Sequence, residues 1–144
     1  MEQVQINNTE KFMALKKAMI RLGDLEKTEK ARNSLLEYAR MQMYSYMWPS
    51  HIKLLAEKLE AVERGDIKRL AIFMPPRHGK SQLTSQFFPA WFIGRNPSKY
   101  VIATTYSQDL ADDFGRSVRN QMLDEGFQKT FPECNLSRDS TSVK

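Results

Sequence analysis

The sequence has only one cysteine, Cys134, and only two histidines, so it is poor in the residues that build disulfides and zinc sites. A lone cysteine cannot close an internal disulfide. His51 and His78 lie too far apart in the sequence for the usual spacing of metal ligands. These absences exclude a disulfide scaffold and a zinc module, and they indicate a reducing, intracellular compartment.

Long hydrophobic runs are absent as well. No apolar segment has the length needed to span a bilayer, and the first residues, MEQVQINNTEKF, lack the basic-then-apolar order of a signal peptide. We therefore predict a cytoplasmic protein without a membrane partner. The formal net charge of +5 is a mild excess, which permits a nucleic-acid partner without requiring one.

The first half of the 144-residue chain has the composition and periodicity of helices. Leu, Met, Ala, Lys and Glu predominate over 11–22 and 28–43, with Gly23-Asp24 as the expected interruption. After Trp48-Pro49, apolar residues at helical spacing predict a third helix, with Ser50 as its N-cap and Gly65 as its C-cap.

The second half alternates between two kinds of segment. Residues 68–74 and 99–105 are short, apolar and rich in strand-forming residues, so they predict buried strands. Helices are expected after each strand, over 79–93 with a kink or restart at Pro89, and then from Ser107 as N-cap with Asp109 in the first turn. This order predicts an α/β fold, a parallel sheet with flanking helices over 48–144, preceded by a helical region over 1–47.

Between the first predicted strand and its helix lies the loop MPPRHGKSQLT, residues 74–84. Its Gly79, Lys80 and Ser81 match the end of the phosphate-binding pattern G-x-x-x-x-G-K-[ST]. In that role Gly79 lets the backbone approach phosphates, Lys80 reaches the β- and γ-phosphates, and Ser81 ligates Mg²⁺. Met74 replaces the first glycine, and Pro75 and Pro76 remove two N–H donors. The alternative interpretation is a surface turn between strand and helix.

Five blocks occur in one order along the chain, WPSHIKLLAEKLEAVERGDIKRL, PPRHGKS, FPAWFIGRNP, TYSQDLADDFGRSVR and FPECNLSRDS. Together they resemble the N-terminal ATPase region of a tailed-phage terminase large subunit, and the resemblance covers about residues 48–139. It implies a P-loop ATPase that uses ATP and Mg²⁺ to drive DNA into a capsid. By this resemblance Lys80 and Arg77 act in catalysis and Ser81 holds the metal, and the nucleotide is contacted by Pro76, Arg77, His78, Gly79, Lys80, Ser81, Gln82 and His51.

Some assignments around this loop have a plain structural alternative. Trp48 and Tyr46 are candidates for stacking on adenine, or they anchor the entry of the helix. Arg116 and Arg119 are candidates for contacts with DNA or with a neighbouring subunit's nucleotide, or they belong to a solvated helix face. His51 contacts adenine or caps its helix.

ATP hydrolysis also needs an apolar strand that ends in Asp, for the Mg²⁺ shell, followed by Glu to activate water. No such strand occurs in the sequence. We reject Asp124-Glu125 as this acidic pair, because the apolar residues before it follow the period of a helix and not of a strand. The resemblance implies that this strand and a nuclease domain lie beyond residue 144, so we predict little or no ATP turnover by the chain alone. It also implies double-stranded DNA, a terminase small subunit, the portal protein and a homo-oligomer as partners.

Two other classes of function remain open on the sequence. One is another P-loop NTPase fragment, from a helicase or a nucleotide kinase, although further DNA-tracking motifs are absent. The other is a non-catalytic terminase-like remnant or interaction module, which binds DNA or a small subunit through residues 11–47.

Overall fold

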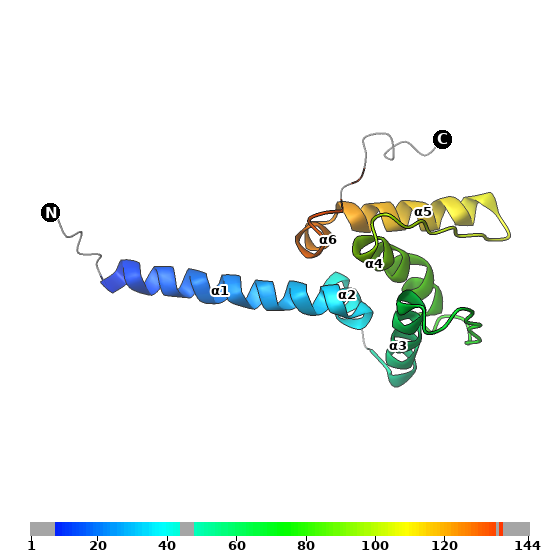
Figure 1. Cartoon of the computed structure of the whole chain (residues 1–144), viewed down its shortest axis with the longest axis horizontal. Coiled ribbons are helices and arrows are strands. Elements are labelled where there is room, and N and C mark those ends of the chain that lie inside the picture. The colour runs from blue at the N-terminus through cyan, green and yellow to red at the C-terminus, as the bar shows by residue number, and fades with distance from the viewer. Residues whose placement is uncertain (1–7, 44–47, 135, 137–144) are drawn as a thin grey trace.

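The computed structural model describes residues 8–43, 48–134 and 136, and this part of the chain is all-α. It is 70% helical and contains no strand or sheet, so the predicted α/β fold is wrong. Tyr46 lies outside the described residues. Figure 1 shows the elements, which are α1 (Asn8–Asn33), α2 (Leu35–Gln42), α3 (Ser50–Arg64), the π-helical stretch η1 (Gln82–Phe87), α4 (Phe88–Arg95), α5 (Gln108–Leu123) and α6 (Glu125–Thr130).

The two predicted strands are extended segments that pair with nothing in the described part of the chain. Along 70–74 the side chains alternate as in a strand: Phe73 is 93% exposed, whereas its neighbours Ile72 and Met74 pack against the core. In the second segment Tyr100 and Ile102 are 94% and 87% exposed. Alternating apolar residues can pack one side of an extended segment against a core of helices. The pattern alone therefore does not establish that the segment pairs with another strand.

The helix α1 runs without interruption through Gly23, so the predicted break there is wrong. A glycine inside a helix costs only about 1 kcal/mol and does not end it. The observed break is at Ser34, where the Glu60 carboxylate of α3 accepts hydrogen bonds from Leu35 N (2.7 Å) and from Ser34 Oγ (3.1 Å). The start of α2 is therefore capped by a residue from another helix.

The predicted caps of the later helices are mostly confirmed. Gly65 ends α3 in the left-handed conformation with φ 86°, and Ser107 Oγ accepts the N–H of Leu110 at 3.4 Å at the start of α5. Asp109 lies in the first turn of α5. Ser50 is not an N-cap, because Pro49 takes that position and Ser50 is the first residue of α3.

The helix expected over 79–93 continues through Pro89 without a break, and its winding changes from π to α just before that residue. Pro89 lies in the first turn of α4, and the six residues before Phe88 form η1, where Phe88 N donates to Leu83 O, five residues earlier. A proline in a regular α-helix clashes with the carbonyl four residues before it, and a wider turn moves that carbonyl away. The π-helical stretch therefore accommodates Pro89.

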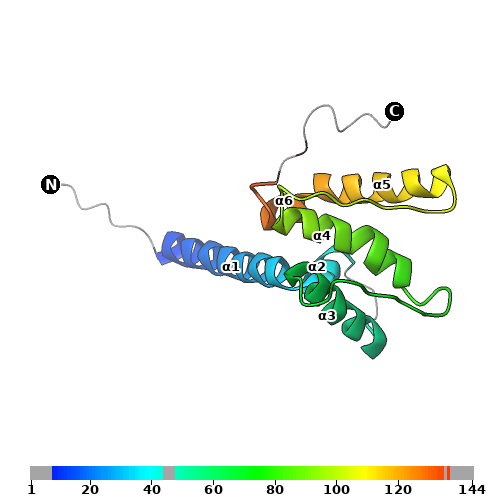
Figure 2. The same ribbon diagram turned by 45° about the vertical axis from the view of Figure 1, so that its right-hand side comes forward.

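The core forms where α4 lies between α5 and α2, as Figure 2 shows. Trp91 is 1% exposed, and its Nε1–H donates to the carbonyl of Ala31 at 3.1 Å, which fixes the C-terminal end of α1 to α4. The other large side chains that are less than 2% exposed are Tyr38, Phe127, Leu35, Ile52 and Leu83.

Tyr38 is fully buried, yet its hydroxyl has no hydrogen-bond partner among the described residues. Because an unpaired buried hydroxyl is costly, we expect Tyr38→Phe to raise the free energy of unfolding by about 1 kcal/mol. Burial, with Asp124 nearby, also raises the pKa of this phenol. Above about pH 10 the unfolded chain therefore loses the proton before the folded chain does, and stability falls as pH rises.

Urea unfolding of both proteins at pH 8 and pH 10.5 tests this expectation. The gain from Tyr38→Phe should be larger at pH 10.5, because the variant lacks the phenol that titrates. A loss of stability in the variant at pH 8 would show that the hydroxyl has a partner.

Candidate functional site

The loop with the phosphate-binding pattern connects the extended segment 68–74 to the helical residues that begin at Lys80. Its backbone is curled by two left-handed residues, Arg77 with φ 64° and Gly79 with φ 78°. Glycine adopts such angles at no cost, whereas arginine does so rarely. Helical hydrogen bonding starts at Leu83 N, which donates to Gly79 O at 3.0 Å. The N–H groups before Leu83 therefore have no intrahelical acceptor.

Two cations flank this curled backbone. Arg77 is exposed and Lys80 is half-buried, and neither side chain forms an ion pair within the described part of the chain. The Lys80 carbonyl accepts a hydrogen bond from Thr84 Oγ1 at 2.9 Å, which holds the backbone of this first turn. An anion at the loop would meet two basic side chains that are not already neutralised.

The structure brings together His51 and His78, which the sequence separates by a helix and an extended segment. Their ring centroids are 5.9 Å apart. His78 Nδ1–H donates to the carbonyl of Pro76 at 2.8 Å, which turns the ring back along the loop. His51 thus lies beside the loop, as a contact to a bound nucleotide would require, although its contact with adenine stays a prediction.

Trp48 also lies next to the loop, but the space between them is small. Trp48 and Gly79 line a cavity of about 10 Å³, together with Ile52, Gln82, Leu83 and Phe87. That volume holds about one water molecule and no adenine ring. In this conformation Trp48 anchors the start of α3 against η1, and any stacking on adenine needs another face of the indole.

The remaining loop residues differ in how well they suit a nucleotide. Ser81 is exposed, and its hydroxyl makes no hydrogen bond with the described residues, so it is available as a ligand. Gln82 is turned away, because its Nε2 donates to the sulfur of Met43 at 2.7 Å. Pro76 contributes its carbonyl to His78. A phosphate-binding loop was expected between a strand and a helix. Among the described residues the helix after the loop is present and the strand before it is absent.

The other polar candidates are engaged on their own helices. Arg116 pairs with Asp113 at 2.7 Å, and Arg119 donates to Asn120 Oδ1 at 3.2 Å. Asp124 caps α6 by accepting the N–H of Gly126 at 2.8 Å.

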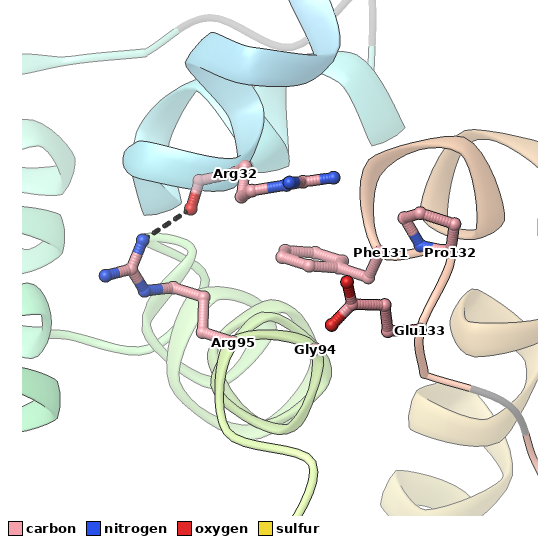
Figure 3. A pocket seen from close by; sticks show the side chains of 6 residues that line it. All are labelled: Arg32, Gly94, Arg95, Phe131, Pro132 and Glu133. Atoms are coloured by element: carbon pink, nitrogen blue, oxygen red, sulfur yellow. Dashed lines mark hydrogen bonds between the residues drawn. The ribbon is translucent and has the colours of Figure 1, made fainter.

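A larger cavity, of about 270 Å³, lies where α1, α4 and the end of α6 meet (Figure 3). Its arginines are used to join helices: Arg95 Nη1 donates to the Arg32 carbonyl and Arg95 Nε to Glu63, at 2.9 and 3.1 Å. Arg32 Nε donates to the carbonyl of Thr130 at 2.9 Å. We interpret this cavity as a packing junction rather than a second candidate site.

Neither a protein-built metal site nor a membrane helix is present in the described part of the chain. Over those residues, no group of three or more His, Cys, Asp and Glu side chains could hold a metal ion. None of the helices there has both the length and the apolar character needed to cross a bilayer.

Comparisons with known proteins give no relative: no family model, no curated protein and no solved structure matches the chain. Membership of the terminase family therefore stays a prediction from the sequence blocks. The adjacency of His51 and His78 was not expected, because no linear pattern links residues in two separate elements.

Proposed function

We propose that the chain binds ATP with Mg²⁺ through the loop 76–81, as part of a DNA-packaging terminase large subunit. The observation that carries the proposal is the curled backbone at Arg77 and Gly79, flanked by two basic side chains without an ion-pair partner in the described residues. Alternating backbone conformations of this kind present N–H groups to anions.

The metal would accompany the nucleotide in this proposal. Ser81 offers one exposed hydroxyl, and Mg²⁺ usually takes its other ligands from phosphates and water. Lys80 would neutralise the outer phosphates, and Arg77 would approach the γ-phosphate from the exposed side of the loop. Because the described residues hold no metal-binding carboxylate cluster, we expect binding without rapid hydrolysis.

Titration of the chain with a fluorescent ATP analogue in the presence of Mg²⁺ tests this site. We expect Lys80→Ala to weaken binding at least tenfold, because one of the two cations that face the phosphates is lost. Lys58→Ala, on the exposed face of α3, is the matched control and should leave the affinity unchanged. Equal affinities for the wild type and Lys80→Ala would reject the loop as the site.

On the same resemblance we propose double-stranded DNA, a small subunit and the portal protein as partners of the packaging assembly. Binding of DNA through Lys and Arg should fall steeply as salt is added, whereas a helical protein contact should depend on salt only weakly. Salt titration against a DNA duplex therefore distinguishes the two kinds of partner.

A further inference from the structure

The first two-thirds of α1 present apolar side chains to solvent. Every residue of 8–22 is exposed, and Figure 1 shows the helix projecting away from the other elements. Apolar patches of this kind on a folded chain mark interaction sites. The large apolar side chains of α1, each 57–65% exposed, are Phe12, Met13, Leu15, Met19, Ile20, Leu22 and Leu25.

Most of these side chains lie on one face. We call the face the α1 seam, and it consists of Phe12, Leu15, Met19, Leu22 and Leu25, with the small Ala18 between them. Steps of three and four residues keep side chains on one side of a helix, as in paired helices. Met13 and Ile20 fall on the roughly opposite face at 3.6 residues per turn.

The seam is symmetric about its own midpoint, which lies between Ala18 and Met19. When the helix is reversed about this point, Phe12 exchanges with Leu25 and Leu15 exchanges with Leu22. A two-fold axis joins identical surfaces and needs a patch that is complementary to itself. This arrangement therefore suits an antiparallel pair of identical helices.

The charges beside the seam point to the same arrangement. All charged residues in 11–21 are basic, namely Lys11, Lys16, Lys17 and Arg21, whereas 24–29 contains three acidic residues, Asp24, Glu26 and Glu29, and one basic residue, Lys27. In an antiparallel pair about this midpoint, Lys11 of one helix lies opposite Glu26 of the other, whereas Lys16 lies opposite Arg21. A parallel pair would place like charges together.

We propose that the α1 seam binds a second copy of this chain as an antiparallel helical pair. About the midpoint of the seam, Lys11 of one copy lies opposite Glu26 of the other, and this contact occurs twice. The proposal does not depend on nucleotide binding, because the seam and the loop belong to different elements.

The rest of the fold leaves room for the second copy. The body holds α1 only near its C-terminal end, where Ala31 is buried and Arg32 donates to the carbonyl of Thr130. An overlap over 12–25 is about 20 Å long at the rise of an α-helix. The two bodies would then lie at opposite ends of the helical pair.

Sedimentation of the chain from about 1 to 100 μM tests the pairing. We expect a reversible dimer that Leu15→Glu/Leu22→Glu weakens at least a hundredfold, because four carboxylates enter the apolar contact. The control is Met13→Glu/Ile20→Glu, which adds the same charge to similarly exposed positions and should leave the dimer intact. Circular dichroism should show that both variants keep their helices.

A charge exchange tests the direction of the pair. Lys11→Glu alone and Glu26→Lys alone should each weaken the dimer about fivefold, whereas the double variant should restore the wild-type affinity. A wild-type chain that stays monomeric at about 100 μM would overturn the proposal, as would equal effects of the seam and control variants. Single charge variants without effect would overturn the antiparallel arrangement, and a monomer that sediments with phosphatidylserine vesicles would assign the seam to a lipid surface.

Discussion

Replacing Trp91 by alanine is expected to lower the free energy of unfolding by about 4 kcal/mol, a larger effect than for any other substitution proposed for this chain. The indole is 1% exposed, and its Nε1–H holds the Ala31 carbonyl at 3.1 Å. The variant would leave a cavity between α1 and α4 and an unpaired carbonyl at the end of α1. Chemical denaturation followed by circular dichroism measures the loss.

Two variants make the Trp91 experiment specific. Trp91→Phe keeps an aromatic ring but removes the hydrogen bond, and we expect it to cost less than half of the alanine effect. Phe73→Ala removes an aromatic side chain that is 93% exposed, so it should change stability by no more than about 0.5 kcal/mol. A large loss on Phe73→Ala would mean that the Phe73 side chain is buried.

Gly94→Ala should destabilise the chain by about 2 kcal/mol, although alanine favours helices. A Cβ at position 94 would lie 2.5 Å from Cδ2 and 2.6 Å from Cγ of Phe131. That ring is 3% exposed and packs against Tyr38 and Phe127, with centroids 6.0 and 5.1 Å away, so displacing it would cost these contacts. Thermal unfolding provides the measurement.

A matched glycine and a double variant separate the clash from helix propensity. A Cβ at Gly115 of α5 would have no atom of the described residues within 4 Å, so Gly115→Ala should be neutral or stabilising by up to about 1 kcal/mol. In a Phe131→Leu background, Gly94→Ala should lose most of its effect, because the smaller side chain can move aside. An undiminished effect in that background would contradict contact with Phe131 as the cause.

The parts of the fold that could be predicted depend on neighbours in the sequence. The apolar period of α3 and its end at Gly65 follow from residues within a few positions of one another, as does the Ser107 cap of α5. Such local interactions are visible in a linear pattern. The break between α1 and α2 was not, because Glu60, which caps α2, lies 25 residues from Leu35.

The predicted sheet failed for a related physical reason. The segments 68–74 and 99–105 have side chains suited to strands, but a strand also needs a neighbour for its N–H and C=O groups. Ile72 buries its side chain against helices instead, while Phe73 and Tyr100 remain in solvent. Side-chain pattern and backbone pairing are separate conditions, and only the first is visible in the sequence.

The candidate site was predictable in its residue types but not in its surroundings. Gly79, Lys80 and Ser81 are adjacent in the sequence, so the loop could be found there. The orientation of Gln82 toward Met43 and the approach of His51 to His78 depend on how α2, α3 and η1 pack together. Those contacts decide which predicted loop residues face a ligand.

The π-helical stretch η1 also determines how far the residues at the loop are rotated about the helix axis relative to those of α4. A π turn acts as one residue inserted into an α-helix, and each residue advances an α-helix by about 100°. Lys80 and Ser81 precede this insertion, whereas Trp91, which fixes α4 in the core, follows it. The direction in which Lys80 points is therefore set by the winding of the helix behind it as well as by the loop.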